Sequence, residues 1–173
     1  GCPVDVIIVV ESQAVEEKEE DEVPVIEVEA SIEVGITEEP LEVEGLDAFL
    51  TTGDRTLNVF FGSQSGNSEE LAAKLAKNAS QYGLEGVVHD MDGFDINAMA
   101  SMKRVAIVCS TWGEGEMPDN AEALWQAAAS SGAPRMDGMS FSVLALGDTS
   151  YELFCQSGKD WDKRLEELGA SRV

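Results

Sequence analysis

Two hydrophobic patterns alternate along residues 56–173: short continuous apolar runs and longer stretches with a helical period. The apolar runs have the length and residue types of strands that are buried on both faces of a parallel sheet. They predict strands at Leu57–Phe61, Gly86–His89, Val105–Cys109 and Phe141–Leu146. The stretches between and after them predict helices at Leu71–Ala79, Ile96–Met102, Ala121–Ser130 and Cys155–Leu168.

Polar residues and glycines mark the expected ends of these helices. Gly83 and Gly169 follow the first and last helices, where a C-terminal stop is expected, and Asp119 or Asn120 is expected to cap the third helix. Alternating strands and helices with short links predict right-handed crossovers. The fold class is therefore α/β, a doubly wound parallel sheet with helices on both faces.

Residues 1–55 have a different pattern. An apolar run at Val4–Val10 and an acidic run at Glu16–Glu22 precede a stretch, residues 26–34, in which apolar and mostly acidic residues alternate. Period-two alternation is typical of a strand with one apolar face, but the high charge and few aromatic residues favour an acidic extension or linker without fixed structure. The chain begins with Gly1 and stops just after a predicted helix, so we expect a fragment of a longer protein.

The charge is strongly acidic and unevenly distributed. The chain has a net charge of −23, of which residues 1–47 carry −15, with 16 acidic residues and one basic residue. A nucleic-acid binder or a protein that docks on anionic lipid would need a basic face instead. The charge leaves open a partner with a basic surface.

Cysteine and histidine usage restricts the chemistry further. The three cysteines form no CxxC pair, which favours a reducing, cytoplasmic setting. The chain has one histidine, so a zinc site or a histidine-based triad has almost no residues to draw on. No apolar run approaches the roughly 20 residues that span a membrane.

Three loops follow the carboxyl ends of predicted strands, where open α/β sheets bind ligands. The first, residues 62–68, is rich in glycine and hydroxyl groups and opens a helix, which suits a phosphate. It has no Lys or Arg and neither a GK[ST] nor a GxGxxG motif, so an uncharged cradle for one terminal phosphate fits better than a triphosphate site. Helix capping without any ligand is the alternative.

The other two loops each carry an aromatic ring. Trp112 lies in the loop 110–120 and Tyr151 in the loop 146–155, so both rings follow strand ends and could stack on a flat ligand. Gly113 would allow a peptide to flip near that ligand. The alternative for Trp112 is a loop residue that covers the core. Two rings beside an anion cradle match a planar ring joined to a phosphate, which is the shape of FMN.

Three segments resemble a known family. FGSQSGNSEELA, STWGEGEMPDNA and LGDTSYELFCQSGKDWDKRLEELG are similar to the flavodoxin-like FMN domain of diflavin reductases, and most of all to the flavoprotein (alpha) subunit of NADPH-dependent sulfite reductase. The resemblance covers residues 56–172 and implies a flavodoxin-like sheet of order 2-1-3-4-5. It places the fifth strand after Val173, together with the FAD and NADPH domains.

The resemblance also implies which residues hold FMN. The phosphate would lie on the first loop, the rings of Trp112 and Tyr151 would flank the flavin, and backbone groups of the second and third loops would line it. The cofactor-binding residues implied are Ser63, Gln64, Ser65, Gly66, Asn67, Ser68, Ser110, Thr111, Trp112, Gly113, Gly115, Leu146, Gly147, Asp148, Tyr151 and Phe154.

The function that the resemblance implies is electron transfer. In such reductases FMN receives electrons from FAD, which NADPH reduces, and passes them to a basic-faced partner metalloprotein, here the sulfite reductase haemoprotein. No catalytic residue and no metal ligand is expected in this chain. Two alternatives remain open: a free-standing flavodoxin or FMN-dependent quinone reductase, and a ligand-free interaction module of flavodoxin-like shape.

The cysteines and the acidic residues of the second loop could take part in chemistry, but simpler structural interpretations are available. Cys155 at a helix start could be a reactive thiolate, but Cys109 and Cys155 both fit small buried thiols better. The three loop acids, Glu114, Glu116 and Asp119, are expected to be solvated or to face a basic partner rather than to bind a metal.

The remaining candidates are expected to be structural. His89 follows a strand with no partner nearby in the sequence, so it is expected to be a satisfied or exposed histidine. Trp125 and Trp161 lie in predicted helices and are expected to pack in or near the core rather than to contact a flavin.

Overall fold

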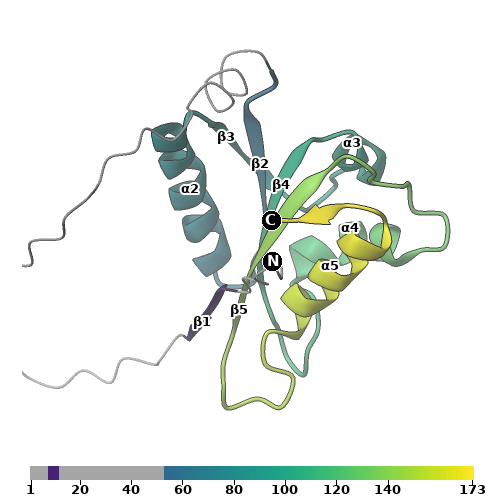
Figure 1. Cartoon of the computed structure of the whole chain (residues 1–173). Helices are drawn as coiled ribbons and strands as arrows, with labels where there is room; N and C mark the ends of the chain where they lie inside the picture. Colours follow the sequence, from purple (N-terminus) through teal and green to yellow (C-terminus); the bar gives the residue numbers. More distant parts are fainter. Residues whose placement is uncertain (1–7, 12–52) are drawn as a thin grey trace, which may run out of the picture.

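The computed structural model describes residues 8–11 and 53–173 (Figure 1). The strands are β1 (Ile8–Glu11), β2 (Thr56–Gly62), β3 (Glu85–Asp90), β4 (Arg104–Ser110), β5 (Ser140–Gly147) and β6 (Ser171–Arg172). The helices are α2 (Asn67–Ala79), a 3₁₀ turn η1 (Ser80–Tyr82), α3 (Ile96–Ala100), α4 (Asp119–Ala129) and α5 (Gln156–Glu167). Each strand and helix predicted after Thr56 is present, with ends shifted by a few residues.

The strands form one parallel sheet. Its order is β1-β5-β4-β2-β3, and every pair, including β6 with β5, is parallel. Counted from β2 as the first strand, the middle of the sheet has the order 2-1-3-4. The predicted doubly wound, flavodoxin-like topology is therefore confirmed.

Two short strands share the outer edge of β5. β1 pairs with Leu144–Gly147 and β6 with Ser140 and Phe141, while β4 occupies the opposite edge. This edge is the fifth position, which the sequence analysis placed beyond Val173, and no part of the acidic segment was expected in the sheet. The unpaired N–H and C=O groups at the edge of a sheet readily pair with a further strand. Ile8–Glu11 suits that role, because three of its four residues are β-branched and favour strands. The acidic run at Glu16–Glu22 and the alternating stretch at 26–34 lie outside the described residues.

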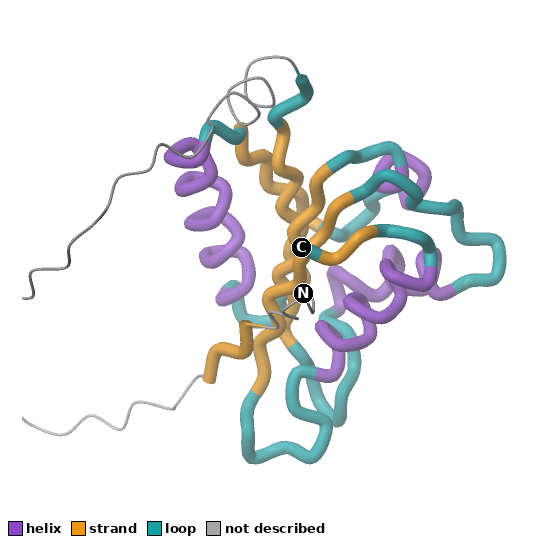
Figure 2. Tube along the Cα trace, viewed as in Figure 1, coloured by secondary structure: helices purple, strands orange, loops and turns teal. Residues whose placement is uncertain are grey.

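Helices cover both faces of the sheet. Figure 2 shows α2 on one face and α3, α4 and α5 on the other. On the α2 face, Val59 and Val108 pack against Ala72 and Ala76. The larger cluster on the other face includes fully buried Trp161. None of the helices in the described part of the chain is both long and apolar enough to cross a bilayer.

Close approach of α2 to the sheet depends on Gly86. A methyl group there would lie 2.3 Å from the carbonyl oxygen of Ala76, so only glycine lets the helix approach β3 this closely. The predicted helix stops are confirmed, since Gly83 and Gly169 both have left-handed backbone conformations, with φ of +73° and +100°.

The start of α4 differs from the prediction. Pro118 is the N-cap residue, and Asp119 and Asn120 are the first two residues of the helix. Their side chains form hydrogen bonds to the loop after β2 instead of capping α4. The expected cap was therefore wrong because tertiary partners engage both side chains.

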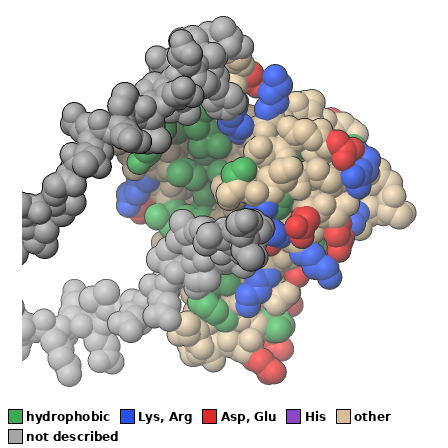
Figure 3. All heavy atoms as spheres, viewed as in Figure 1, with side chains coloured by type: hydrophobic (Ala, Val, Ile, Leu, Met, Phe, Trp, Pro, Cys, Tyr) green, Lys and Arg blue, Asp and Glu red, His purple; other side chains and the backbone are tan. Residues whose placement is uncertain are grey.

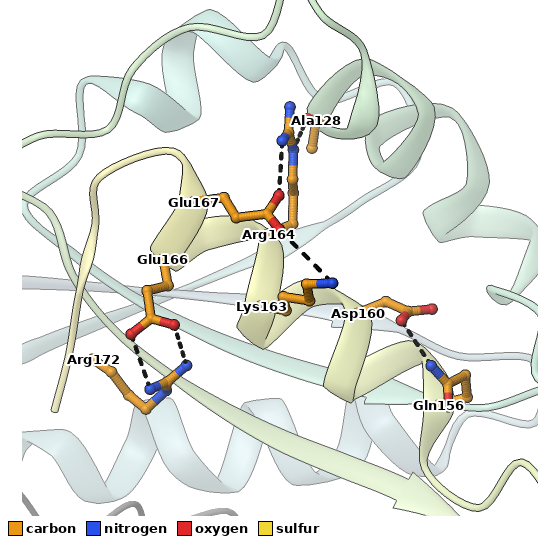
Figure 4. A network of polar contacts seen from close by, with 8 residues as sticks. All are labelled: Ala128, Gln156, Asp160, Lys163, Arg164, Glu166, Glu167 and Arg172. Atoms are coloured by element: carbon orange, nitrogen blue, oxygen red, sulfur yellow. Dashed lines mark hydrogen bonds and ion pairs between the residues drawn. The ribbon is translucent and has the colours of Figure 1, made fainter.

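Charged side chains tie α5 to its neighbours (Figure 4). Arg164 donates to the carbonyl of Ala128 at 2.8 Å and so joins α5 to the end of α4. Arg172 in β6 pairs with Asp162 at 2.8 Å and with Glu166 at 3.2 Å. In the view of Figure 3, charged side chains of both signs lie on the α5 side, whereas hydrophobic side chains gather beside α2.

Candidate functional site

Three loops begin side by side at one end of the sheet. The pairing register sets Gly62 opposite Cys109, Cys109 opposite Ala145, and Ser110 opposite Leu146. β2, β4 and β5 therefore end at the same level, and the loops 63–66, 111–118 and 148–155 leave from one edge. The arrangement expected for a ligand site at the carboxyl ends of the strands is present.

The first loop is held together by the hydroxyl of Ser63. Gly66, in a left-handed conformation with φ of +88°, precedes α2. The hydroxyl oxygen of Ser63 accepts hydrogen bonds from the backbone N–H groups of Gly66 at 2.9 Å and Ser68 at 3.3 Å. The hydroxyl of Ser68 is buried and has no partner among the described residues.

The second notable feature of the first loop is the unpaired hydroxyl of Ser68. A buried hydroxyl without a partner costs about 1–3 kcal/mol. Ser68 lies in the first turn of α2, where the helix dipole attracts negative charge. The bonds that Gly66 and Ser68 donate to the Ser63 hydroxyl are also those of a capped helix start, so both interpretations of this loop agree with the structure.

A cavity of about 330 Å³ lies between the second and third loops. Both aromatic rings line it and remain half-exposed, Trp112 at 52% and Tyr151 at 57%. A tryptophan this exposed does not cover the core, so the alternative interpretation of Trp112 is not supported. The lining residues are Thr111, Trp112, Gly113, Gly147, Asp148, Tyr151, Leu153, Phe154 and Cys155.

The second loop is a tight hairpin. Trp112 and Glu116 exchange backbone hydrogen bonds of 2.9 and 2.8 Å. Gly113 and Gly115 make the turn possible, with φ of +51° and +108°. The hydroxyl of Ser157, in the first turn of α5, donates to the carbonyl of Glu116 at 2.7 Å. The backbone that carries Trp112 is therefore fixed from both sides.

The third loop closes on itself. A methyl at Gly147 would lie 2.7 Å from the backbone nitrogen of Cys155, so the two ends of the loop touch. Cys155 is the only described non-glycine residue with a positive φ, +57°. Hydrogen bonds from the Ser150 hydroxyl and N–H hold the pKa of the Asp148 carboxyl below its usual value, so it is ionised at neutral pH.

The remaining predicted residues are not in the lining of this cavity. The N–H of Thr111 donates to the carbonyl of Leu146 at 2.9 Å, and the hydroxyl of Ser110 donates to the carbonyl of Gly62 at 3.2 Å. The side chain of Gln64 is engaged by Asp119. Leu153 and Cys155 were missed as lining residues, although they flank Phe154 directly in the sequence.

His89 and the two helical tryptophans agree with their structural interpretations. His89 contacts Asn58 through its Nε2 atom at 2.9 Å and stacks on Phe60. Trp125 and Trp161 pack edge to face. No cluster of potential metal ligands occurs within the described ranges.

Both described cysteines are expected to resist alkylation in the native protein. Burial raises the pKa of the Cys109 thiol to about 12 and also raises the pKa of the Cys155 thiol. A raised pKa removes the reactive thiolate at pH 8. Mass spectrometry after iodoacetamide treatment should therefore find both residues modified only when denaturant is present. Rapid native labelling of Cys155 would show instead that its loop opens.

The comparisons with known proteins agree with this geometry. The flavodoxin family model matches residues 59–173. The chain is 44% identical over 119 residues to the sulfite reductase [NADPH] flavoprotein alpha-component of Bacillus subtilis (strain 168), covering 69% of this chain and 20% of that protein. It is also 44% identical over 117 residues to the protein of the same name from Thiocapsa roseopersicina, covering 68% and 22%. The chain thus spans about a fifth of the length of these curated relatives.

Solved structures show the same fold. Oxidised flavodoxin 2 from Bacillus cereus superposes with a TM-score of 0.60 at 29% identity, covering 68% of this chain and 79% of that one. The resemblance stated from three sequence segments is therefore confirmed. Because the family model extends from β2 to the last residue and includes all three loops at the strand ends, the chain belongs to the flavodoxin family.

Proposed function

We propose that residues 56–173 form an electron-transfer domain that works through bound FMN. The observation that carries the proposal is the pair of half-exposed rings, Trp112 and Tyr151, on one cavity at the sheet edge from which the first loop also leaves. FMN is the cofactor that membership of the flavodoxin family indicates, as predicted from the sequence. When bound, it supplies the redox chemistry, while the protein binds and orients it.

The residues divide into two binding roles. The first loop, from Ser63 to Ser68, would hold the phosphate through hydroxyl and backbone N–H groups without any cation. Trp112 and Tyr151 would stack on the flavin, and Thr111, Gly113 and Gly147 would contact its edge. No side chain is assigned a general acid or base role, because the redox chemistry belongs to the flavin.

The wider proposal concerns the protein to which this domain belongs. The relatives are named as flavoprotein components of NADPH-dependent sulfite reductase. By analogy, FAD and NADPH domains would supply electrons to this domain, and a basic-faced metalloprotein, the sulfite reductase haemoprotein, would accept them. The exposed acids Glu114 and Glu152 line a second hollow next to Tyr151 and suit such a partner. Such a reductase would work in the cytoplasm, in keeping with the cysteine pattern.

The test is flavin binding followed by electron transfer. We expect the 173-residue protein to quench FMN fluorescence with one site per chain and to become yellow. After chemical reduction under nitrogen, the complex should transfer electrons to a haemoprotein, followed by the haem absorption bands. A chain that remains colourless at saturating FMN would contradict the proposal. A chain that binds FMN but reduces no haemoprotein would retain the binding site and lose the electron-transfer role.

A further inference from the structure

We propose that Asn120, in the first turn of α4, is a positioning residue for the phosphate loop. The proposal rests on the function proposed above, in which residues 63–68 hold the FMN phosphate. Asn120 lies on a different element from that loop and is not among the residues predicted to bind the cofactor. It acts through the backbone of Ser63.

The side-chain amide of Asn120 joins three elements. Its Oδ1 atom accepts a hydrogen bond from the N–H of Ser63 at 2.9 Å. Its Nδ2 group donates to the carbonyl of Phe61 at 3.3 Å and to Oδ1 of Asp90 at 2.9 Å. The end of β2, the end of β3 and the start of the phosphate loop are thereby fixed to α4.

The neighbours of Asn120 extend this contact along the loop. Asp119 and Gln64 form two reciprocal hydrogen bonds, from Gln64 Nε2 to Asp119 Oδ2 at 3.1 Å and from the Asp119 N–H to Gln64 Oε1 at 3.2 Å. A methyl at Gly62 would lie 2.9 Å from Cβ of Ala121, which shows how closely the end of β2 approaches the start of α4. Residues 119, 120 and 121 thus face residues 64, 63 and 62 in antiparallel order, with Asn120 at the centre.

Fixing Ser63 fixes the cradle. Its hydroxyl accepts from the N–H groups of Gly66 and Ser68, which open α2. A loop held in its binding conformation does not lose freedom when the ligand arrives, so affinity is gained without a direct contact. Only an amide side chain of this length supplies both the acceptor for Ser63 and the donors for Phe61 and Asp90.

The test compares FMN with riboflavin, which has the same ring system but no phosphate. The variants are Asn120→Leu, which removes all three hydrogen bonds, and Asn120→Asp, which keeps an acceptor but sets a carboxylate against Asp90. Asn97→Leu is the matched control, because Asn97 is an exposed asparagine in the first turn of α3. Affinities are measured by fluorescence titration of the full 173-residue chain, and folding is checked by thermal unfolding without flavin.

We expect the FMN dissociation constant to rise by about 10-fold or more in Asn120→Leu, the scale of a lost buried hydrogen bond, and by less in Asn120→Asp, which keeps the acceptor for the N–H of Ser63. The riboflavin dissociation constant should change by less than about 2-fold, because riboflavin has no phosphate for the loop to hold. The visible spectrum of the saturated FMN complex should stay that of wild type. Asn97→Leu should bind both flavins normally.

Three results separate the possible failures. Unchanged FMN affinity in folded Asn120 variants would overturn the proposal. Equal weakening of FMN and riboflavin, or an altered flavin spectrum, would overturn it too, because Asn120 would then act on the ring pocket. If Asn120→Leu fails to fold, Asn120→Ala, which also removes all three hydrogen bonds and adds no charge, gives the same comparison. A wild-type chain that binds neither flavin would instead refute the proposed function.

Discussion

Replacing Tyr151 by alanine is expected to weaken FMN binding by about 1–3 kcal/mol, the scale of removing one buried aromatic contact. The free protein leaves the ring 57% exposed at the mouth of the cavity, so the side chain contributes little to folding and is available to stack on a ligand. Each 1.4 kcal/mol is about tenfold in affinity. Trp112→Ala is expected to have an effect of the same size. Both are measured by quenching of FMN fluorescence.

Two controls separate stacking from general damage. Tyr151→Phe keeps the ring and should retain most of the affinity. Tyr82→Ala removes a tyrosine that is 74% exposed in the turn after α2, away from the cavity, and should leave binding unchanged. If both alanine variants at Tyr151 and Trp112 bound FMN as tightly as wild type, neither ring could have a stacking role.

Trp161→Ala is expected to cause the largest loss of stability. Trp161 is fully buried in the cluster between the sheet and α4, edge to face with Trp125 at 5.1 Å between ring centres. Truncating a buried tryptophan to alanine costs about 3–5 kcal/mol, against a total free energy of unfolding of about 5–15 kcal/mol for a domain. Urea unfolding followed by circular dichroism measures the change.

A phenylalanine variant makes this prediction sharper. The indole N–H of Trp161 is buried without a partner among the described residues. Trp161→Phe removes that unpaired group as well as some volume, so its loss should be only about 1–2 kcal/mol. Trp112→Ala, at an exposed position, should change the unfolding free energy by less than about 0.5 kcal/mol without flavin. An alanine loss at Trp161 below 1 kcal/mol would contradict the burial described here.

The middle of the sheet could be predicted because its signals are local. The run Val105–Cys109 is apolar at each position and is buried at each position in β4. The position of β1 could not be predicted in this way, because it depends on an open edge of β5 more than 130 residues away in the sequence. An acidic, glutamate-rich context pointed to a linker, yet four residues within it pair with the sheet.

The candidate site likewise contains residues that the sequence marks and residues that only the fold reveals. Trp112 and Tyr151 could be picked out from the sequence because both rings follow the carboxyl ends of predicted strands, where open α/β sheets bind ligands, and both line the cavity. Asn120 carries no such signal. A polar residue at a helix start ordinarily caps that helix, and only the fold brings the N–H of Ser63 within 2.9 Å of its side chain.

The left-handed conformation of Cys155 limits how this position can vary during evolution. At a φ of +57°, glycine, asparagine and aspartate are tolerated best, whereas valine, isoleucine or threonine would strain the backbone. Substitutions that become fixed at this position should therefore be mostly glycine, asparagine or aspartate, whether or not the thiol of Cys155 has a function. In a saturation library selected for flavin retention, the surviving amino acids would report the shape of the backbone rather than the chemistry of a thiol.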